Sequence, residues 1–244
     1  MEAAEYRKLA EVEDRMWYFR ALHGHVERTL IAGLGPAGGS ILDAGCGTGG
    51  LIRRLASRHA NWRWTGVDVE PLAYELARER TAGAEIRAAN VTALPLADAS
   101  FDAVVSADVL YHVDDDAAAL REFFRVLRPG GMVVLNVPAY RWLWSYHDEA
   151  VHSRRRYGRK ELLAKVGAAG FTATRGTHWN ALPLPLVVVR RKLWPAPRDG
   201  SDVSLFPAPI ETVFRGAMAM ERAWLETFGA LPFGSSIFIV ARKR

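Results

Sequence analysis

The chain has 244 residues, of which 50% are hydrophobic and 24% are charged. This length and composition predict one large domain with a full core, and they exclude a disordered protein and a disulfide-stapled miniprotein. The formal net charge of +5 favours anionic partners but is far below that of a nucleic-acid-binding protein, so no nucleic-acid partner is expected.

A cytoplasmic location is expected. The single cysteine, Cys46, permits neither an internal disulfide nor a cysteine-based metal site, which suits a reducing compartment. Residues 1–9 are charged and lack the apolar stretch of a secretion signal. The longest apolar run, 181–189, contains two prolines and is much shorter than the ~20 residues that span a bilayer, so no transmembrane segment is expected.

The first element is predicted to be one helix over residues 3–32, because apolar residues recur there at spacings of three and four. Glycines and a proline between 33 and 39 end it. From residue 40 onward short apolar runs alternate with amphipathic stretches, which predicts a parallel sheet with helices on both faces. The expected strands are 41–44, 62–67, 84–88, 101–107, 132–137, 171–178 and 236–241, and the expected helices are 50–59, 71–82, 115–127 and 159–169.

The stretch 179–234 does not follow this alternation of apolar runs and amphipathic stretches. It holds seven of the twelve prolines and a predicted helix near 209–228. About 55 residues are too few for an independent core, so we expect an insertion before the last strand rather than a second domain. The predicted organisation is one domain, 1–244, with a helical N-terminal part (1–39), a core (40–178), the insertion (179–234) and a last strand (235–244).

A glycine-rich turn follows the first predicted strand. Gly45, Gly47 and Gly50 satisfy the spacing G-x-G-x-x-G, in which glycine allows a tight turn and close approach of a ligand. Asp68 ends the second predicted strand, 23 positions after Gly45, where a carboxylate can accept two hydrogen bonds from a ribose. Together they predict a nucleoside-bearing ligand at the carboxyl ends of the strands, either a nicotinamide cofactor or S-adenosylmethionine.

Asp43, two residues before the first glycine, favours the second ligand. A pyrophosphate has no use for a carboxylate there, whereas the cationic amino-acid end of S-adenosylmethionine does. Three further segments, 90–96, 100–105 and 127–131, complete a pattern that resembles the class I S-adenosylmethionine-dependent methyltransferases, in a broad bacterial, small-molecule branch of type 11/12. The resemblance covers about 40–137 and continues faintly to the end of the chain.

The resemblance implies a doubly wound, mostly parallel seven-stranded sheet with an antiparallel last strand. It also implies S-adenosylmethionine as cofactor, with S-adenosylhomocysteine as product. Asn90 stands where such proteins usually carry an acid that accepts from the adenine amino group, and an amide oxygen can still accept that bond. The implied cofactor-binding residues are Tyr18, Arg20, Asp43, Gly45, Cys46, Gly47, Asp68, Val69, Asn90, Val91, Ala107 and His112.

The loop after the fifth predicted strand, 140–157, should face the methyl donor because loops at strand carboxyl ends line the ligand crevice. Tyr146, His147 and His152 are the candidates for taking a proton from an acceptor hydroxyl or amine. A metal site there is not expected, because a basic run, 154–160, lies next to it. That run could clamp an anionic acceptor or form a solvated face.

The expected function is transfer of a methyl group to an oxygen, nitrogen or carbon atom of a small or lipid-like acceptor, by a monomer or homodimer. Two alternatives are a nicotinamide-dependent oxidoreductase and a non-catalytic cofactor-binding scaffold that docks on a partner or a membrane through 181–194. The apolar patch 182–189 needs cover, and three surfaces could provide it: the acceptor pocket, a second subunit, or a lipid surface in a peripheral membrane contact. The acceptor pocket is the favoured expectation.

Overall fold

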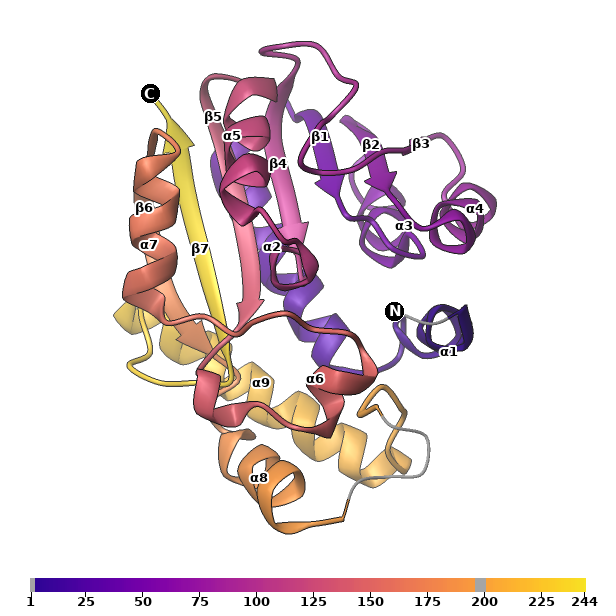
Figure 1. Ribbon diagram of the computed structural model, residues 1–244, viewed down its shortest axis with the longest axis vertical. Coiled ribbons are helices and arrows are strands. Elements are labelled where there is room, and N and C mark those ends of the chain that lie inside the picture. Colours follow the sequence, from indigo (N-terminus) through magenta and orange to yellow (C-terminus); the bar gives the residue numbers. More distant parts are fainter. Residues whose placement is uncertain (1–2, 196–200) are drawn as a thin grey trace.

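A computed structural model describes residues 3–195 and 201–244. Its centre is a seven-stranded sheet in the order β3-β2-β1-β4-β5-β7-β6. The strands are β1 (Gly39–Ala44), β2 (Trp62–Asp68), β3 (Glu85–Ala88), β4 (Phe101–Ala107), β5 (Leu127–Pro138), β6 (Phe171–Trp179) and β7 (Ser236–Lys243). β7 is antiparallel to both β5 and β6, while the other pairs are parallel, so the predicted mixed sheet with an antiparallel last strand is confirmed (Figure 1).

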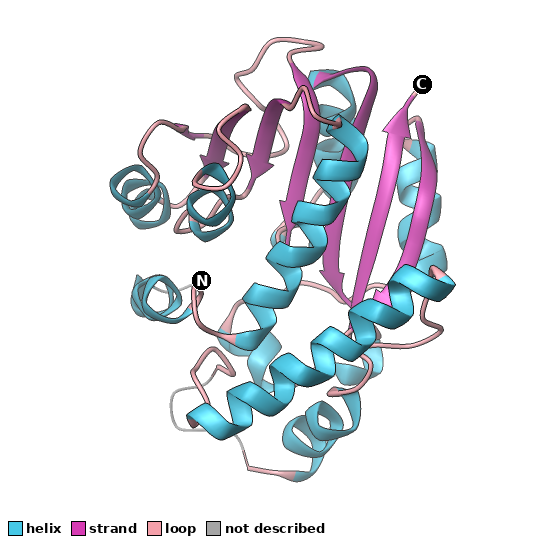
Figure 2. Ribbon diagram, turned by 180° about the vertical axis from the view of Figure 1, so that it is seen from behind, coloured by secondary structure: helices cyan, strands magenta, loops and turns pink. Residues whose placement is uncertain are grey.

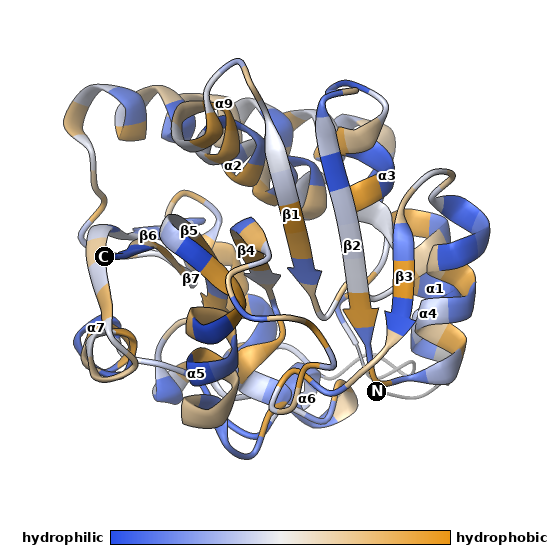
Figure 3. Cartoon of the chain, turned by 90° about the horizontal axis from the view of Figure 1, so that it is seen from above, coloured by the Kyte–Doolittle hydropathy of each residue, from blue (hydrophilic) through white to orange (hydrophobic). Residues whose placement is uncertain are grey.

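Helices cover both faces of this sheet (Figure 3). One face carries α2 (Trp17–Leu34), α3 (Gly50–Ala56) and α4 (Pro71–Arg80), and the other carries α5 (Asp116–Val126) and α7 (Arg159–Ala168). Each face buries its own apolar cluster: Val26, Leu30 and Ile52 belong to the first, and Leu120 and Phe123 to the second. The strands are therefore buried on both sides, which explains their nearly uninterrupted apolar sequences.

The single helix expected over 3–32 is wrong. The structure has two helices, α1 (Ala3–Val12) and α2, separated by a turn at 13–16. The apolar periodicity continues across the break, but the Glu13 side chain accepts a hydrogen bond from the Thr48 hydroxyl at 2.7 Å. It also pairs with Arg80. These tertiary contacts hold Glu13 against the glycine turn and redirect the chain.

The insertion between β6 and β7 is helical, as expected. It contains α8 (Leu184–Val188), a short π-helical turn η3 (Val189–Leu193) and α9 (Ala208–Phe228). Figure 2 shows α9 running beside α2 on one side of the sheet. The Trp17 and Phe214 rings stack at 4.7 Å, and the Trp17 backbone N–H donates to Glu211, so α9 is fixed to the start of α2.

The loop after β5 forms η2 (Arg141–Leu143) and α6 (Tyr146–Ala150), and the segment after β4 forms a short turn, η1 (Leu110–His112). A buried ion pair holds this loop: Arg156 Nε and Nη2 lie 2.7 and 3.0 Å from the two carboxylate oxygens of Asp148. The third Arg156 contact is to the Ala139 carbonyl, at 3.0 Å. Both side chains are almost fully buried, so neither charge is compensated by water.

Replacement of Arg156 by leucine should therefore lower the free energy of unfolding by about 3–5 kcal/mol, because it leaves the Asp148 charge buried without its partner. Adding Asp148→Asn should restore part of the loss, since that change removes the unpaired charge. Chemical denaturation measures both. Arg141→Leu is the control: this side chain is 78% exposed in its pair with Glu161, and its loss should cost no more than about 0.5 kcal/mol.

Candidate functional site

A cavity of about 1040 Å³ lies at the carboxyl ends of β1, β2 and β4. The sheet order reverses between β1 and β4, and such a switch point is where open α/β sheets bind ligands. Of the residues expected to bind the cofactor, the cavity is lined by Tyr18, Asp43, Gly45, Cys46, Gly47, Asp68, Val69, Asn90, Val91, Ala107 and His112. Arg20 is exposed and does not line this cavity, so its role stays a prediction.

The glycine turn forms the floor of the cavity. Gly45 and Gly47 have φ angles of 88° and 52°, which L-residues with a side chain rarely adopt. A Cβ on Gly45 would also collide with the Val109 side chain. The backbone N–H groups of Gly45 and Cys46 both donate to the Val67 carbonyl, which ties the turn to the end of β2.

Asp68 closes the same turn from β2. One carboxylate oxygen accepts the Gly47 backbone N–H at 2.8 Å, and the other accepts that of Glu70 at 3.0 Å. Each oxygen keeps a further lone pair for a ligand hydroxyl. Burial raises the pKa of Asp68 although these N–H groups oppose the shift. The carboxylate is thus fixed in place before any ligand arrives.

Asp43 is a buried carboxyl group with an unsatisfied atom. Its side chain lines the cavity, and its Oδ2 has no hydrogen-bond partner among the described residues. Burial, with smaller effects of the Asp68 and Glu13 charges, raises its pKa to about 8. An orphaned acceptor of this kind fits a ligand that brings a cationic hydrogen-bond donor.

Val69 and Asn90 lie beside Asp68 at the outer part of the cavity. Val69 is 69% exposed although it is apolar, which is the arrangement expected of a residue that packs on a ligand ring. The Asn90 amide oxygen accepts both the backbone N–H and the hydroxyl of Thr92, each at 3.0 Å. Its two lone pairs are therefore engaged within the turn, and the predicted bond to an adenine amino group would have to displace or share one of them.

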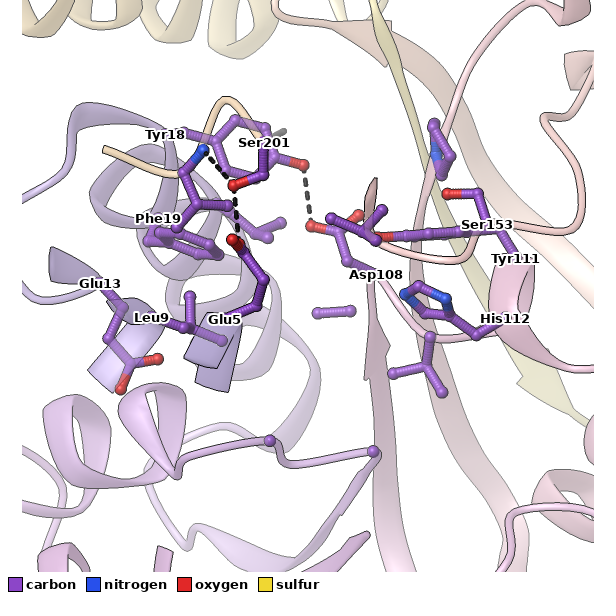
Figure 4. A pocket seen from close by; sticks show the side chains of 18 of the residues that line it. Glu5, Leu9, Glu13, Tyr18, Phe19, Asp108, Tyr111, His112, Ser153 and Ser201 are labelled. Atoms are coloured by element: carbon purple, nitrogen blue, oxygen red, sulfur yellow. Dashed lines mark hydrogen bonds between the residues drawn. The ribbon is translucent and has the colours of Figure 1, made fainter. Parts of the chain in front are cut away.

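Sequence reasoning missed Asp108, the first residue after β4. Its φ of 59° is unusual for a residue with a side chain, and it turns the carboxyl group into the cavity toward Tyr18 (Figure 4). Tyr18 donates to Oδ2 at 2.9 Å, and the Asn136 side chain donates to Oδ1 at 2.8 Å. Trp179 in turn donates to the Asn136 amide oxygen at 2.7 Å.

Tyr18 and Asn136 both donate to the carboxylate, so Asp108 is held as a hydrogen-bond acceptor. The titratable groups that face it are Tyr18 and Tyr111, and the Asp108 charge helps to raise the pKa of both phenols. Burial raises the pKa of Asp108 to about 6, against the opposing effect of its two donors. The only trace of this in the sequence is one acid directly after a predicted strand, which is too common a pattern to identify a site.

The N-terminal helices form the opposite wall, with Glu5, Leu9, Glu13 and Phe19 facing the cavity (Figure 4). The Ser201 hydroxyl donates to Glu5 at 2.7 Å, so the part of the insertion that precedes α9 contacts α1. Glu13, another residue that sequence reasoning missed, has a pKa raised by burial despite its contact with Arg80. Glu13, Asp43 and Asp68 are buried, and with the half-buried Asp108 they place four carboxyl groups along this part of the cavity.

The three residues expected to act as bases lie in the loop after β5. His147 lines the cavity, but its Nδ1 accepts the Asp202 backbone N–H at 3.1 Å, and burial lowers its pKa to about 3. Tyr146 donates to the Asp202 carboxylate at 2.7 Å and does not line the cavity. His152 lines the cavity at an exposed position. Their catalytic roles stay predictions.

Comparison with known proteins gives a consistent result. Residues 42–135 match the family model described as a methyltransferase domain. The chain is 35% identical over 171 residues to a malonyl-[acyl-carrier protein] O-methyltransferase of Pseudescherichia vulneris, covering 64% of this chain and 62% of that protein. It is 28% identical over 210 residues to the 2-methyl-6-phytyl-1,4-hydroquinone methyltransferase of Synechocystis, covering 83% and 61%. The chain thus spans less than two thirds of the length of either relative.

Among solved structures, the fold is similar to that of a geranyl diphosphate C-methyltransferase from Streptomyces coelicolor. The TM-score is 0.61 at 18% identity, covering 93% of this chain and 81% of that one. At this identity the likeness concerns the fold alone.

The raised pKa of Asp43 predicts an unusual pH dependence of stability. The folded protein binds this proton more tightly than the unfolded chain, in which the pKa is near 3.8, so stability is lost as pH rises from about 4 through 8. Asp43→Asn should therefore raise the melting temperature more at pH 8.5 than at pH 5.

Asp102→Asn is the matched control for that experiment. Burial raises the pKa of Asp102, but the hydrogen bond from Arg128 opposes this effect, and that pKa lies below its ordinary value. The Asp102 charge therefore stabilises the fold at both pH values. Asp102→Asn should lower the melting temperature at pH 5 and at pH 8.5. A gain from Asp43→Asn that is equal at both pH values would contradict the assigned burial of the charge.

Proposed function

We propose that this chain, a member of the class I S-adenosylmethionine-dependent methyltransferases, moves a methyl group from S-adenosylmethionine to a small or lipid-like acceptor. One observation carries the proposal: the glycine turn, the fixed carboxylate of Asp68 and the Asp43 carboxyl group meet in one cavity, and no described residue bonds to Asp43 Oδ2. The family-model match over residues 42–135 supports the class of protein, and this geometry supports the ligand.

The residues of the cavity fit this cofactor. Asp68 would accept from the ribose hydroxyls, Val69 would pack on the adenine, and the Val91 backbone would serve the ring. Asp43 would accept from the ammonium group of the methionine part, which satisfies its orphaned oxygen. A nicotinamide dinucleotide fits less well, because its pyrophosphate would lie beside Asp43 and meet a buried acid.

When bound, S-adenosylmethionine supplies a methyl group on a positively charged sulfur, and the electron pair of the broken carbon–sulfur bond stays on that sulfur. The chain's part is to align the acceptor and to take its proton. We assign the proton to Asp108, at the end of β4, because it faces the cavity as an acceptor-only group and keeps two lone pairs. His147 is a weaker base, since its lowered pKa disfavours protonation.

We further propose that the acceptor is largely apolar. The insertion contributes Leu186, Val187, Phe206 and Phe214 to the cavity wall. Three of the four arginines that line the cavity are engaged with carboxylates: Arg154 with Asp114, Arg156 with Asp148 and Arg191 with Asp202. The fourth, Arg190, lies over the Tyr146 ring. An anionic group on the acceptor would have to compete with these acids. Oxygen, nitrogen and carbon acceptors all remain within the proposal.

A cytoplasmic location belongs to the same proposal, since the only cysteine, Cys46, is buried beside the cofactor cavity and carries no disulfide. The alternative of a non-catalytic scaffold is decided by a methyl-transfer assay over hydroquinone, fatty-acyl carrier-protein and prenyl acceptors. Turnover of any one of them excludes the scaffold.

Asp68→Ala should weaken S-adenosylmethionine binding by about 30- to 1000-fold, corresponding to the loss of roughly 2–4 kcal/mol of charge-assisted hydrogen bonds. Isothermal titration calorimetry measures the affinity directly. Glu75→Ala, which removes an exposed acid from α4, controls for the change of net charge and should leave the affinity unchanged. Equal affinities for both variants would remove the cofactor assignment.

Asp108→Asn should lower kcat by about 10²- to 10⁴-fold, with little effect on cofactor affinity, because an amide cannot take the proton. In the native enzyme the rate should fall as pH drops through about 6, where the carboxylate becomes protonated, and the variant should lose this limb of the profile. The measurement uses the acceptor found in the panel. Asp98→Asn, an exposed acid, is the control. An unchanged pH profile in Asp108→Asn would place the base elsewhere.

A further inference from the structure

The helical segment α8–η3, residues 184–193, carries apolar side chains on its outer side. Leu186, Val189 and Leu193 follow one another at spacings of three and four, and all are exposed. Leu182 and Trp194 extend the row at its two ends, and Leu193 and Trp194 are the most exposed, at 76% and 66%. We call these five residues the apolar row. A row of this kind in contact with water is unfavourable unless another surface covers it.

Basic side chains accompany the apolar row. Arg190, Arg191 and Lys192 are consecutive, and no acidic residue occurs between 181 and 195. Arg191 is paired with Asp202 at 2.9 Å. Arg190 lies over the Tyr146 ring and donates to the Pro195 carbonyl, and Lys192 donates to the Trp144 carbonyl. Neutral groups therefore hold Arg190 and Lys192 near the apolar row.

We propose that α8–η3 docks this protein on the surface of an anionic lipid bilayer, with the apolar row in the interface and Arg190 and Lys192 toward lipid phosphates. A short amphipathic helix with leucines and a tryptophan on one side and basic residues beside them is the usual form of an interfacial membrane contact. None of the described helices is long and apolar enough to cross a bilayer.

The charge distribution favours lipid over a second copy of the chain. In a two-fold dimer the same patch faces itself, so Arg190 and Lys192 of one subunit would meet a partner segment, 181–195, that has basic but no acidic residues. Like charges that meet across an interface are strongly unfavourable. An anionic bilayer instead offers opposite charge to the basic residues and hydrocarbon to the apolar row.

The same segment forms a wall of the cofactor cavity. Leu186, Val187, Arg190 and Arg191 line it, and Leu186 is also 53% exposed, so it belongs to both surfaces. Figure 1 shows α8 beyond the carboxyl ends of β4 and β5, at the end of the molecule that holds the cavity. Docking through α8–η3 would thus bring the cavity to the bilayer, where a lipid-like acceptor resides. This consequence rests on the proposed function, whereas docking itself does not.

Sedimentation with vesicles tests the docking without any acceptor. The full chain should bind vesicles of phosphatidylcholine with 30% phosphatidylglycerol, and binding to phosphatidylcholine alone should be at least tenfold weaker. Added salt should weaken the binding because the lipid charge is screened. The double variant Arg190→Gln/Lys192→Gln should reduce partitioning by about fivefold for each charge removed.

A second variant separates the apolar row from the charges. Leu193→Ala/Trp194→Ala should lower vesicle binding about tenfold or more, because these are the two most exposed members of the row. Neither residue lines the cavity, so affinity for S-adenosylmethionine should stay unchanged and would show that the variant is folded. The matched controls are Arg78→Gln/Arg121→Gln, two exposed arginines on α4 and α5, and Ile31→Ala, an exposed apolar residue on α2. Both controls should bind vesicles like the native chain.

Three results would overturn the proposal. The first is no binding to anionic vesicles at low salt. The second is an equal loss of binding in the control variants, which would indicate adsorption through net charge alone. The third is a dimer in light scattering that Leu193→Ala/Trp194→Ala dissociates, which would assign the apolar row to a subunit interface. Vesicle binding by a chain that does not bind S-adenosylmethionine would leave the docking intact and contradict only the proposed function.

Discussion

The concentration of buried acids at one edge of the sheet is the constraint on which the rest of the structure depends. Parallel strands bring their carboxyl ends to the same edge, and β1, β2 and β4 end in or next to Asp43, Asp68 and Asp108. Glu13 joins them from the turn between α1 and α2. Burial raises the pKa of all four carboxyl groups, which means that the ionised forms are unfavourable in the folded protein.

The four acids differ in the groups that donate hydrogen bonds to them. Asp68 is held by backbone N–H groups, Asp108 by a phenol and an amide, and Glu13 by Thr48 and Arg80. Asp43 alone keeps a buried oxygen without a partner among the described residues. A cationic ligand would remove this penalty, so affinity for the ligand and instability of the empty site have the same physical origin.

The N-terminal helices and the insertion enclose this edge of the sheet. The N-terminal helices reach it through Glu13, and the insertion reaches it through contacts with those helices, such as the Trp17–Phe214 stack and the Glu5–Ser201 bond. Segments nearly 200 residues apart in sequence therefore form one wall. The same insertion presents its other side outward, so a single short segment, α8–η3, can serve both the cavity and an external surface.

The sequence by itself determined the sheet, its helical layers and the place of the ligand. Alternating apolar runs and amphipathic stretches specify a buried parallel sheet, and the glycine turn with Asp68 at its fixed spacing identifies the binding edge, because these signals are local in the chain. Local signals also explain the error at 13–16, where the apolar period continued but long-range bonds from Glu13 to Thr48 and Arg80 broke the helix.

Only the tertiary structure decided what surrounds each acid. Asp108 looked like any acid after a strand, and its character depends on Tyr18, Asn136 and Trp179, which lie 90, 28 and 71 positions away in the sequence. His147 looked like a base, but burial and the Asp202 backbone N–H make it a weak one. Spacing in a sequence places side chains on an element, whereas proton affinity depends on burial and partners, and these are fixed only when distant segments pack together.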